Sequence, residues 1–101
     1  MIILYVLKDC PYCNNALRIL KDNKIEFNSI YPENIEQKEL FKKQNKMNTF
    51  PQIFLKLDKD NYMKIGGCDN LIELINICNN IKNSNTSLDS IYYMYQLLNS
   101  K

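Results

Sequence analysis

The sequence predicts an α/β domain with a mixed four-stranded sheet flanked by helices on both faces. Short apolar runs rich in β-branched residues alternate along the chain with segments whose apolar residues recur at helical spacing. The chain has 101 residues, of which 46% are hydrophobic and 24% charged, as in ordinary globular domains. A chain of this length can bury one modest core.

The first third of the chain has the pattern of a strand, a helix and a second strand. Residues 2–7 are apolar and rich in β-branched side chains, which is typical of a buried strand. Pro11 suits the first position of a helix, because its missing N–H would have no partner there in any case. The apolar residues that follow share one helical face: Cys13, Ala16, Leu17 and Leu20. Residues 25–30 alternate apolar with polar side chains, so we expect a second, parallel strand completing a βαβ unit.

The middle of the chain predicts a weak helix followed by a β-hairpin. Residues 34–44 are mostly polar. Their apolar contribution comes from three residues: Ile35, Leu40 and Phe41. Residues 52–57 and 62–65 have the composition of strands, and the short polar segment between them predicts a turn.

The last third predicts a packed helix, a linker and a terminal helix. Gly66 and Gly67 precede a helix that we expect to begin at Asp69. Its apolar face holds Leu71, Leu74, Ile75 and Cys78. Residues 79–86 are polar and predict a linker, and Ser87 is suited to cap a last helix.

The expected element order is therefore β-α-β-α-β-β-α with an extra C-terminal helix. This order is the thioredoxin-like layout, a mixed four-stranded sheet flanked by helices. We expect residues 1–101 to form a single domain, in which residues 83–101 supply the C-terminal linker and helix.

Charge and hydropathy argue against two classes of function. Thirteen basic and eleven acidic residues leave a net charge of +2, which is too small and too dispersed for a nucleic-acid footprint. No run approaches the roughly 18 apolar residues of a membrane-spanning helix. The N-terminus has no basic segment of the kind that opens a signal peptide. We therefore expect a cytoplasmic protein that binds neither nucleic acid nor membrane.

The four cysteines are spaced unevenly, with one C-x-x-C pair at Cys10 and Cys13. Such a pair can be a redox dithiol, half of a zinc site, or two structural cysteines that happen to be close. Zinc usually takes a second C-x-x-C or a histidine pair. The chain has no histidine, and Cys68 and Cys78 lie ten residues apart. A cysteine on an apolar helix face, such as Cys78, is by default a buried and inert thiol. The redox reading is favoured, and we expect no metal.

Cys10 has the position that activates a thiol. It lies where a strand ends and a helix begins, so unpaired N–H groups and the helix dipole should stabilise its thiolate. Lys8 adds a positive charge nearby. Cys13 lies one helical turn further on, within reach of Cys10 but shielded by the helix. We therefore expect Cys10 to attack disulfides and Cys13 to resolve the product.

Three motifs in the chain resemble those of the glutaredoxins, specifically the dithiol type that carries C-P-Y-C. They are Cys10-Pro11-Tyr12-Cys13, Thr49-Phe50-Pro51 where the family usually has T-V-P, and Gly66-Gly67-Cys68-Asp69-Asn70 where the family usually has G-G-x-D-D. The resemblance runs from about residue 2 to residue 80. Thioredoxins usually carry W-C-G-P-C, and this chain has no tryptophan.

The resemblance implies a glutathione site on the second and third motifs. Pro51 would be the family's cis-proline, facing the dithiol, and the Phe50 backbone would pair with the cysteine moiety of glutathione. The N–H groups of Asp69 and Asn70 would receive the γ-glutamyl carboxylate, since a helix N-terminus suits an anion. The Asp69 carboxylate would meet the γ-glutamyl ammonium, whereas Asn70 would contribute mainly its backbone.

The resemblance also places residues near the dithiol. Tyr12 would flank the pocket, and Lys8 would face the glycine carboxylate of glutathione. In the family the basic residue usually stands three positions before the first cysteine, whereas Lys8 stands two before Cys10. Cys68 is expected to be a passive small residue.

The implied activity is that of a glutathione-dependent thiol–disulfide oxidoreductase, with glutathione as co-substrate. Its substrates would be protein–glutathione mixed disulfides and protein disulfides, with ribonucleotide reductase among the candidate partners. We expect a monomer. Two alternatives remain: a carrier of a glutathione-ligated [2Fe–2S] cluster, which Pro11 disfavours because such members mostly have Gly or Ser there, and a thioredoxin-like reductant that does not use glutathione.

Overall fold

The computed structural model describes residues 1–82, in which four strands and three helices follow the predicted order. The elements are β1 (Ile2–Tyr5), α1 (Pro11–Asp22), β2 (Phe27–Ile30), α2 (Ile35–Asn45), β3 (Gln52–Lys56), β4 (Tyr62–Gly66) and α3 (Cys68–Lys82). The helix expected to begin at Ser87 lies outside the described residues.

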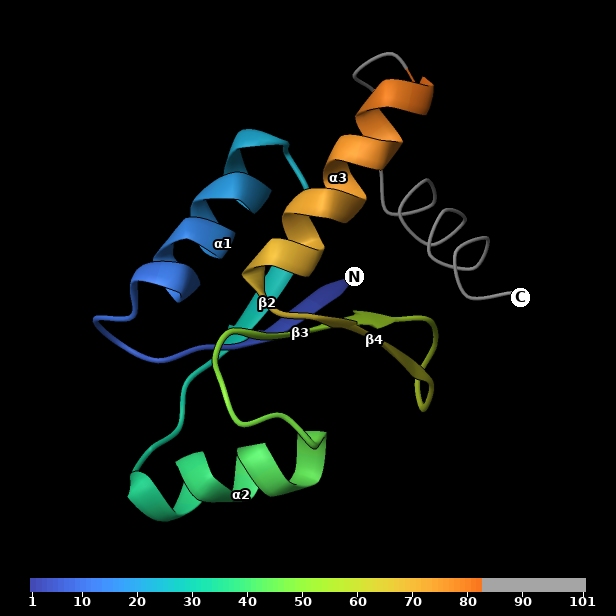
Figure 1. Cartoon of the computed structure of the whole chain (residues 1–101). Coiled ribbons are helices and arrows are strands. Elements are labelled where there is room, and N and C mark those ends of the chain that lie inside the picture. The colour runs from blue at the N-terminus through green and yellow to red at the C-terminus, as the bar shows by residue number, and fades with distance from the viewer. Residues whose placement is uncertain (83–101) are drawn as a thin grey trace.

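The four strands form one mixed sheet in the order β2-β1-β3-β4. β1 is parallel to β2, as the predicted βαβ unit requires, and antiparallel to β3. β3 and β4 form the predicted antiparallel hairpin. The carboxyl ends of β1 and β4 and the amino end of β3 consequently meet at one edge of the sheet (Figure 1).

Helices cover both faces of the sheet. α1 and α3 lie side by side on one face, and α2 lies on the other (Figure 1). The main core lies between the sheet and the pair of helices α1 and α3. It is built by alternate residues of the strands, which point to that face, and by the apolar faces of these two helices. Its fully buried side chains include Ile2, Leu4, Val6, Ala16, Leu20, Ile53 and Leu71.

α2 differs from the sequence-based expectation. Of its three apolar residues only Phe41 is buried, and its ring lies 4.8 Å from that of Tyr5 in an edge-to-face contact. Ile35 is 79% exposed and Leu40 is 56% exposed, so two of the three apolar residues of this helix stay outside the core. The helix is fixed instead by its ends: the Asn34 side chain accepts a hydrogen bond from the N–H of Gln37 at 2.8 Å.

Two boundaries also differ. β1 ends at Tyr5 and not at Leu7, and the chain then turns through Asp9, whose φ is 55°, before it reaches Cys10. α3 begins at Cys68 and continues to Lys82, so residues 79–82 belong to the helix and not to the predicted linker. Polar composition does not by itself distinguish a helical turn from a linker.

Candidate active site

Cys10 is the N-cap of α1, at the junction that the sequence predicted. Its backbone is extended, with φ −106° and ψ 110°, and Pro11 occupies the first turn. The Cys10 Sγ accepts a hydrogen bond from the N–H of Cys13 at 3.2 Å. A sulfur that replaces the usual N-cap oxygen is therefore directed at the positive end of the helix, and its side chain remains half-buried.

Cys13 lies one turn further along α1 and is fully buried. Its Sγ accepts a hydrogen bond from the N–H of Leu7 at 3.5 Å. Burial, and next the hydrogen bond with Cys10, raise the pKa of the Cys13 thiol to about 12. A raised pKa favours the protonated thiol of Cys13, which is buried while Cys10 is partly accessible.

The loop before β3 lies against the dithiol. The Phe50–Pro51 peptide bond is cis, as the resemblance implied. The Cys10 thiol donates a long hydrogen bond to the Phe50 carbonyl, with 3.9 Å between Sγ and O. Phe50 and Pro51 are both buried, and the group of this loop that contacts the Cys10 Sγ by a hydrogen bond is the Phe50 backbone carbonyl.

The N-terminus of α3 forms the third side of the site. Asn70 accepts a hydrogen bond on its Oδ1 from the N–H of Gly67 at 3.0 Å, so its side chain caps the helix. Gly66 has a φ of 124°, and a Cβ there would lie 2.5 Å from the Asn70 Oδ1. Asp69 is exposed in the first turn of α3, and the side chain that bonds the N–H of Gly67 is that of Asn70. The Asn70 side chain therefore has a structural task at the start of α3, in addition to the mainly backbone contribution expected of it in binding.

These three segments enclose one cavity of about 350 Å³. It is lined by Tyr12, Met47, Thr49, Phe50, Pro51, Gly67, Cys68, Asp69 and Asn70. Five of the six residues predicted to bind glutathione are in this set. Lys8 is not in it: the residue is exposed in the turn before Cys10. Thr49, Gly67 and Cys68 belonged to the recognised motifs, whereas Met47 carried no signal in the sequence.

Cys68 is the cysteine in the lining of this cavity. It is only 5% exposed, and the Asn15 Nδ2 donates to its Sγ at 3.7 Å. Burial is the main cause that raises the pKa of the Cys68 thiol. These features match the expected passive role, since a protonated, shielded thiol is a poor nucleophile.

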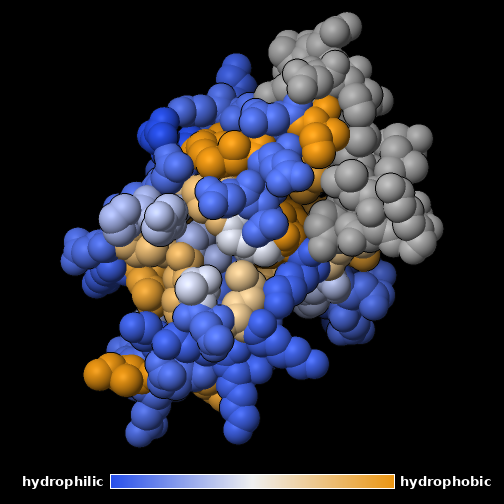
Figure 2. Space-filling model, viewed as in Figure 1, coloured by the Kyte–Doolittle hydropathy of each residue, from blue (hydrophilic) through white to orange (hydrophobic). Residues whose placement is uncertain are grey.

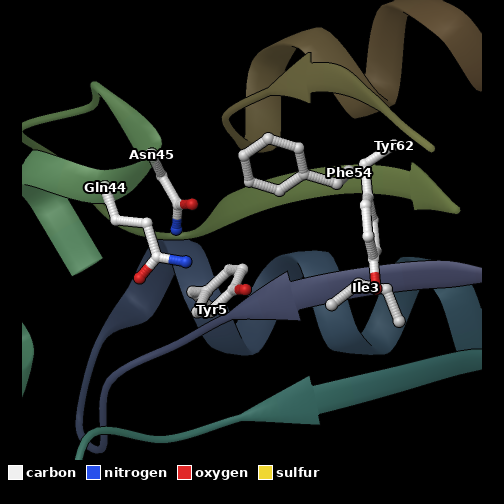
Figure 3. Close-up of a pocket in the computed structure, with 6 residues that line it drawn as sticks. All are labelled: Ile3, Tyr5, Gln44, Asn45, Phe54 and Tyr62. Atoms are coloured by element: carbon white, nitrogen blue, oxygen red, sulfur yellow. The ribbon is translucent and has the colours of Figure 1, made fainter. Parts of the chain in front are cut away.

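A second cavity, of about 250 Å³, lies on the face of the sheet that carries α2 (Figure 3). Its walls are Ile3, Tyr5, Gln44, Asn45, Phe54 and Tyr62. No cysteine lines it, and it does not share a residue with the first cavity. The surface seen in Figure 2 is mostly hydrophilic, with apolar residues in a few small patches.

Two further features concern residues 1–82 only. No group of three or more His, Cys, Asp or Glu side chains in this part of the chain is placed to hold a metal ion. None of its helices is long and apolar enough to cross a membrane.

Comparison with known proteins identifies close relatives. The family pattern described as glutaredoxin matches residues 2–58. Glutaredoxin 1 of Rickettsia typhi is 43% identical over 76 residues, which cover 72% of this chain and 68% of that protein.

Solved structures agree with this result. The glutaredoxin of Brucella melitensis superposes with a TM-score of 0.61 at 31% identity, covering 84% of this chain and 88% of that one. A buckwheat glutaredoxin–glutathione complex superposes with a TM-score of 0.62 at 14% identity, covering 91% of this chain and 76% of that one. Together they confirm the predicted thioredoxin-like fold.

Proposed function

The chain belongs to the glutaredoxin family, whose members are thiol–disulfide oxidoreductases, and from this premise we propose that it uses glutathione to reduce protein–glutathione mixed disulfides and protein disulfides. One observation carries the proposal: the cis-proline loop and the N-terminus of α3 line a single cavity, and the Phe50 carbonyl of that loop lies 3.9 Å from the Cys10 Sγ. Each supplies a group that one part of glutathione needs.

The cavity has matching groups for the ends of the γ-glutamyl moiety. The first N–H groups of α3 have no partner within the helix and attract a carboxylate. Asp69 is exposed beside them and can pair with the ammonium group. The Phe50 backbone borders Cys10 and can hydrogen-bond the cysteine moiety, which would bring the glutathione sulfur to the Cys10 Sγ.

With a glutathionylated protein, Cys10 is sufficient. Its thiolate attacks the glutathione sulfur of the mixed disulfide, and the protein thiolate leaves and takes a proton. The Cys10–glutathione disulfide is then attacked by the thiolate of a second glutathione. Oxidised glutathione leaves, and Cys10 is a thiolate again.

With a protein disulfide, Cys13 is also required. Cys10 forms a mixed disulfide with one sulfur of the substrate, and the other sulfur leaves as a thiol. Cys13, which lies one turn away and loses its proton in this step, attacks Cys10 and releases the reduced protein. Two glutathiones then reduce the Cys10–Cys13 disulfide and become oxidised glutathione.

The test measures turnover of a small glutathione mixed disulfide. The oxidised glutathione that forms is reduced by glutathione reductase, and the consumption of NADPH reports the rate. We expect activity that saturates with the mixed disulfide and is absent in Cys10→Ser. Reduction by thioredoxin reductase, with no turnover of the glutathione substrate, would refute the proposal in favour of a thioredoxin-like reductant.

A further inference from the structure

Gln52 is the one polar or charged side chain that is fully buried in the described part of the chain, with no exposed surface. It directly follows Pro51 and is the first residue of β3. A buried amide costs free energy unless its donor and acceptor are both satisfied. Its retention inside a core of apolar residues therefore calls for a role that an apolar side chain could not fill.

Both ends of the Gln52 amide are hydrogen-bonded to the segment where α2 ends. The Gln52 Nε2 donates to the Met47 carbonyl at 3.0 Å, and the Gln52 Oε1 accepts from the Asn45 Nδ2 at 2.8 Å. Figure 3 shows Asn45 projecting from the end of α2 towards β3. The donor and the acceptor of the Gln52 amide thus both connect this segment to β3.

A second tie comes from β4. The Lys64 Nζ donates to the carbonyls of Asn45 and Lys46, at 3.2 Å each. Lys46 ends the helix with a φ of 54°, a left-handed conformation that turns the chain away from the helix axis. The direction in which the chain leaves α2 is therefore fixed by side chains of the sheet.

The segment held in this way is a wall of the active-site cavity. Met47, Thr49 and Phe50 line it, and the Phe50 carbonyl is the group next to the Cys10 Sγ. Gln52 touches neither the cavity nor Cys10, yet the Met47 carbonyl that it holds lies only three residues before Phe50.

We propose that Gln52 is a positioning residue that sets the Phe50 backbone against Cys10, so that it governs binding of the glutathione moiety and not the reactivity of the thiol. The inference rests on the proposed function, because it needs glutathione in this cavity. Two measurable quantities should therefore respond differently to a change at Gln52. The Michaelis constant for the mixed disulfide should depend on Gln52, whereas the rate at which a small reagent alkylates Cys10 should not.

The test replaces Gln52 with Leu, which keeps the volume and removes both hydrogen bonds. Loss of one well-formed hydrogen bond at the site corresponds to about a tenfold loss of affinity. We expect Gln52→Leu to raise the Michaelis constant by about tenfold, with kcat and the rate of Cys10 alkylation by iodoacetamide within about twofold of the original protein. Asn45→Ala leaves the hydrogen bond between Gln52 and the Met47 carbonyl in place, so it should raise the Michaelis constant by only about two- to threefold.

Leu55→Ala is the matched control, because Leu55 is a buried residue of the same strand that does not line the cavity. It should lower the thermal midpoint at least as much as Gln52→Leu while leaving the Michaelis constant unchanged. If Gln52→Leu is too unstable to purify, Asn45→Ala against Leu55→Ala provides the same comparison.

The two proposals fail in different ways. If the unmodified protein does not turn over the glutathione mixed disulfide, the proposed function is wrong. If it does, and the Gln52→Leu and Asn45→Ala proteins keep its Michaelis constant, the positioning role is wrong. A Michaelis constant that rises equally in Leu55→Ala would also overturn it, since general loosening would then explain the effect.

Discussion

At the scale of single residues, one helical turn separates two thiols with different properties. Cys10 caps α1 and is half-buried, whereas Cys13 is fully buried and has its pKa raised to about 12. The C-x-x-C spacing predicted that the two would be close. The separate roles that we propose for them depend on burial, which sequence spacing does not determine.

The first prediction concerns these roles. Cys10→Ser should abolish all disulfide reduction, because no other accessible thiol lies at the N-terminus of α1. Cys13→Ser should keep the removal of glutathione from proteins and lose the reduction of protein disulfides. Both activities are measured by coupling to glutathione reductase. Loss of deglutathionylation in Cys13→Ser, with Cys10→Ser active, would reverse the assignment.

The second prediction follows from the raised pKa of Cys13, which burial shifts from 9.0 to about 12. Between these values the unfolded chain has lost the proton and the native protein has kept it, so the unfolded state binds fewer protons and stability falls as pH rises. The limiting slope is about 1.4 kcal/mol per pH unit. Below about pH 8 this thiol should have no effect.

The measurement is urea unfolding of the reduced protein between pH 7 and pH 10. The free energy of unfolding should fall more steeply above pH 9 in the original protein than in Cys13→Ser, whose hydroxyl does not titrate there. Parallel curves for the two proteins would show that Cys13 is not held as a neutral thiol.

At the scale of elements, the N-terminus of α3 has two neighbouring side chains with separate tasks. Asn70 accepts from the N–H of Gly67 and caps the helix, whereas Asp69 is exposed beside the cavity. The motif predicted where this helix begins. Which of the two side chains caps it depends on the close approach of Gly66 and Asn70, and that approach is a feature of the folded backbone.

The third prediction separates these tasks. Asn70→Ala should lower the free energy of unfolding by about 1 kcal/mol through the lost cap. Asp69→Ala should change stability less and raise the Michaelis constant for glutathione mixed disulfides by about tenfold, through a lost charge-assisted hydrogen bond. Thermal midpoint and steady-state kinetics are measured on both variants. Unchanged kinetics in Asp69→Ala would remove its binding role.

α2 illustrates the opposite case, an element that exists as predicted but packs differently. Phe41 contacts Tyr5, while Ile35 is largely exposed. The fourth prediction is that Phe41→Ala destabilises the protein by about 3 kcal/mol and that Ile35→Ala changes its stability by less than about 0.5 kcal/mol. Urea midpoints of the two variants provide the measurement. Equal losses would mean that α2 packs through both residues.

At the scale of the whole molecule, the active site is assembled at one edge of the sheet. β1 ends there and leads to Cys10, β3 begins there after Pro51, and β4 ends there before α3 (Figure 1). Because β3 is antiparallel to β1, residues about 40 positions apart in the chain meet, as the contact of Cys10 with Phe50 shows. Three short motifs thereby become one cavity.

The sequence by itself determined the order of the elements and the chemistry of the site. Strand and helix periodicities depend on local spacing, and the three motifs name Cys10, Pro51 and Asp69 without reference to any fold. Only the tertiary structure decided which further residues connect and position these motifs. Gln52 of β3 forms hydrogen bonds with Asn45 and with the Met47 carbonyl at the end of α2, and Lys8 is not part of the cavity lining. The apolar residues of α2 divide into one buried side chain and two exposed ones. These outcomes depend on which surfaces pack together, and local patterns do not contain that information.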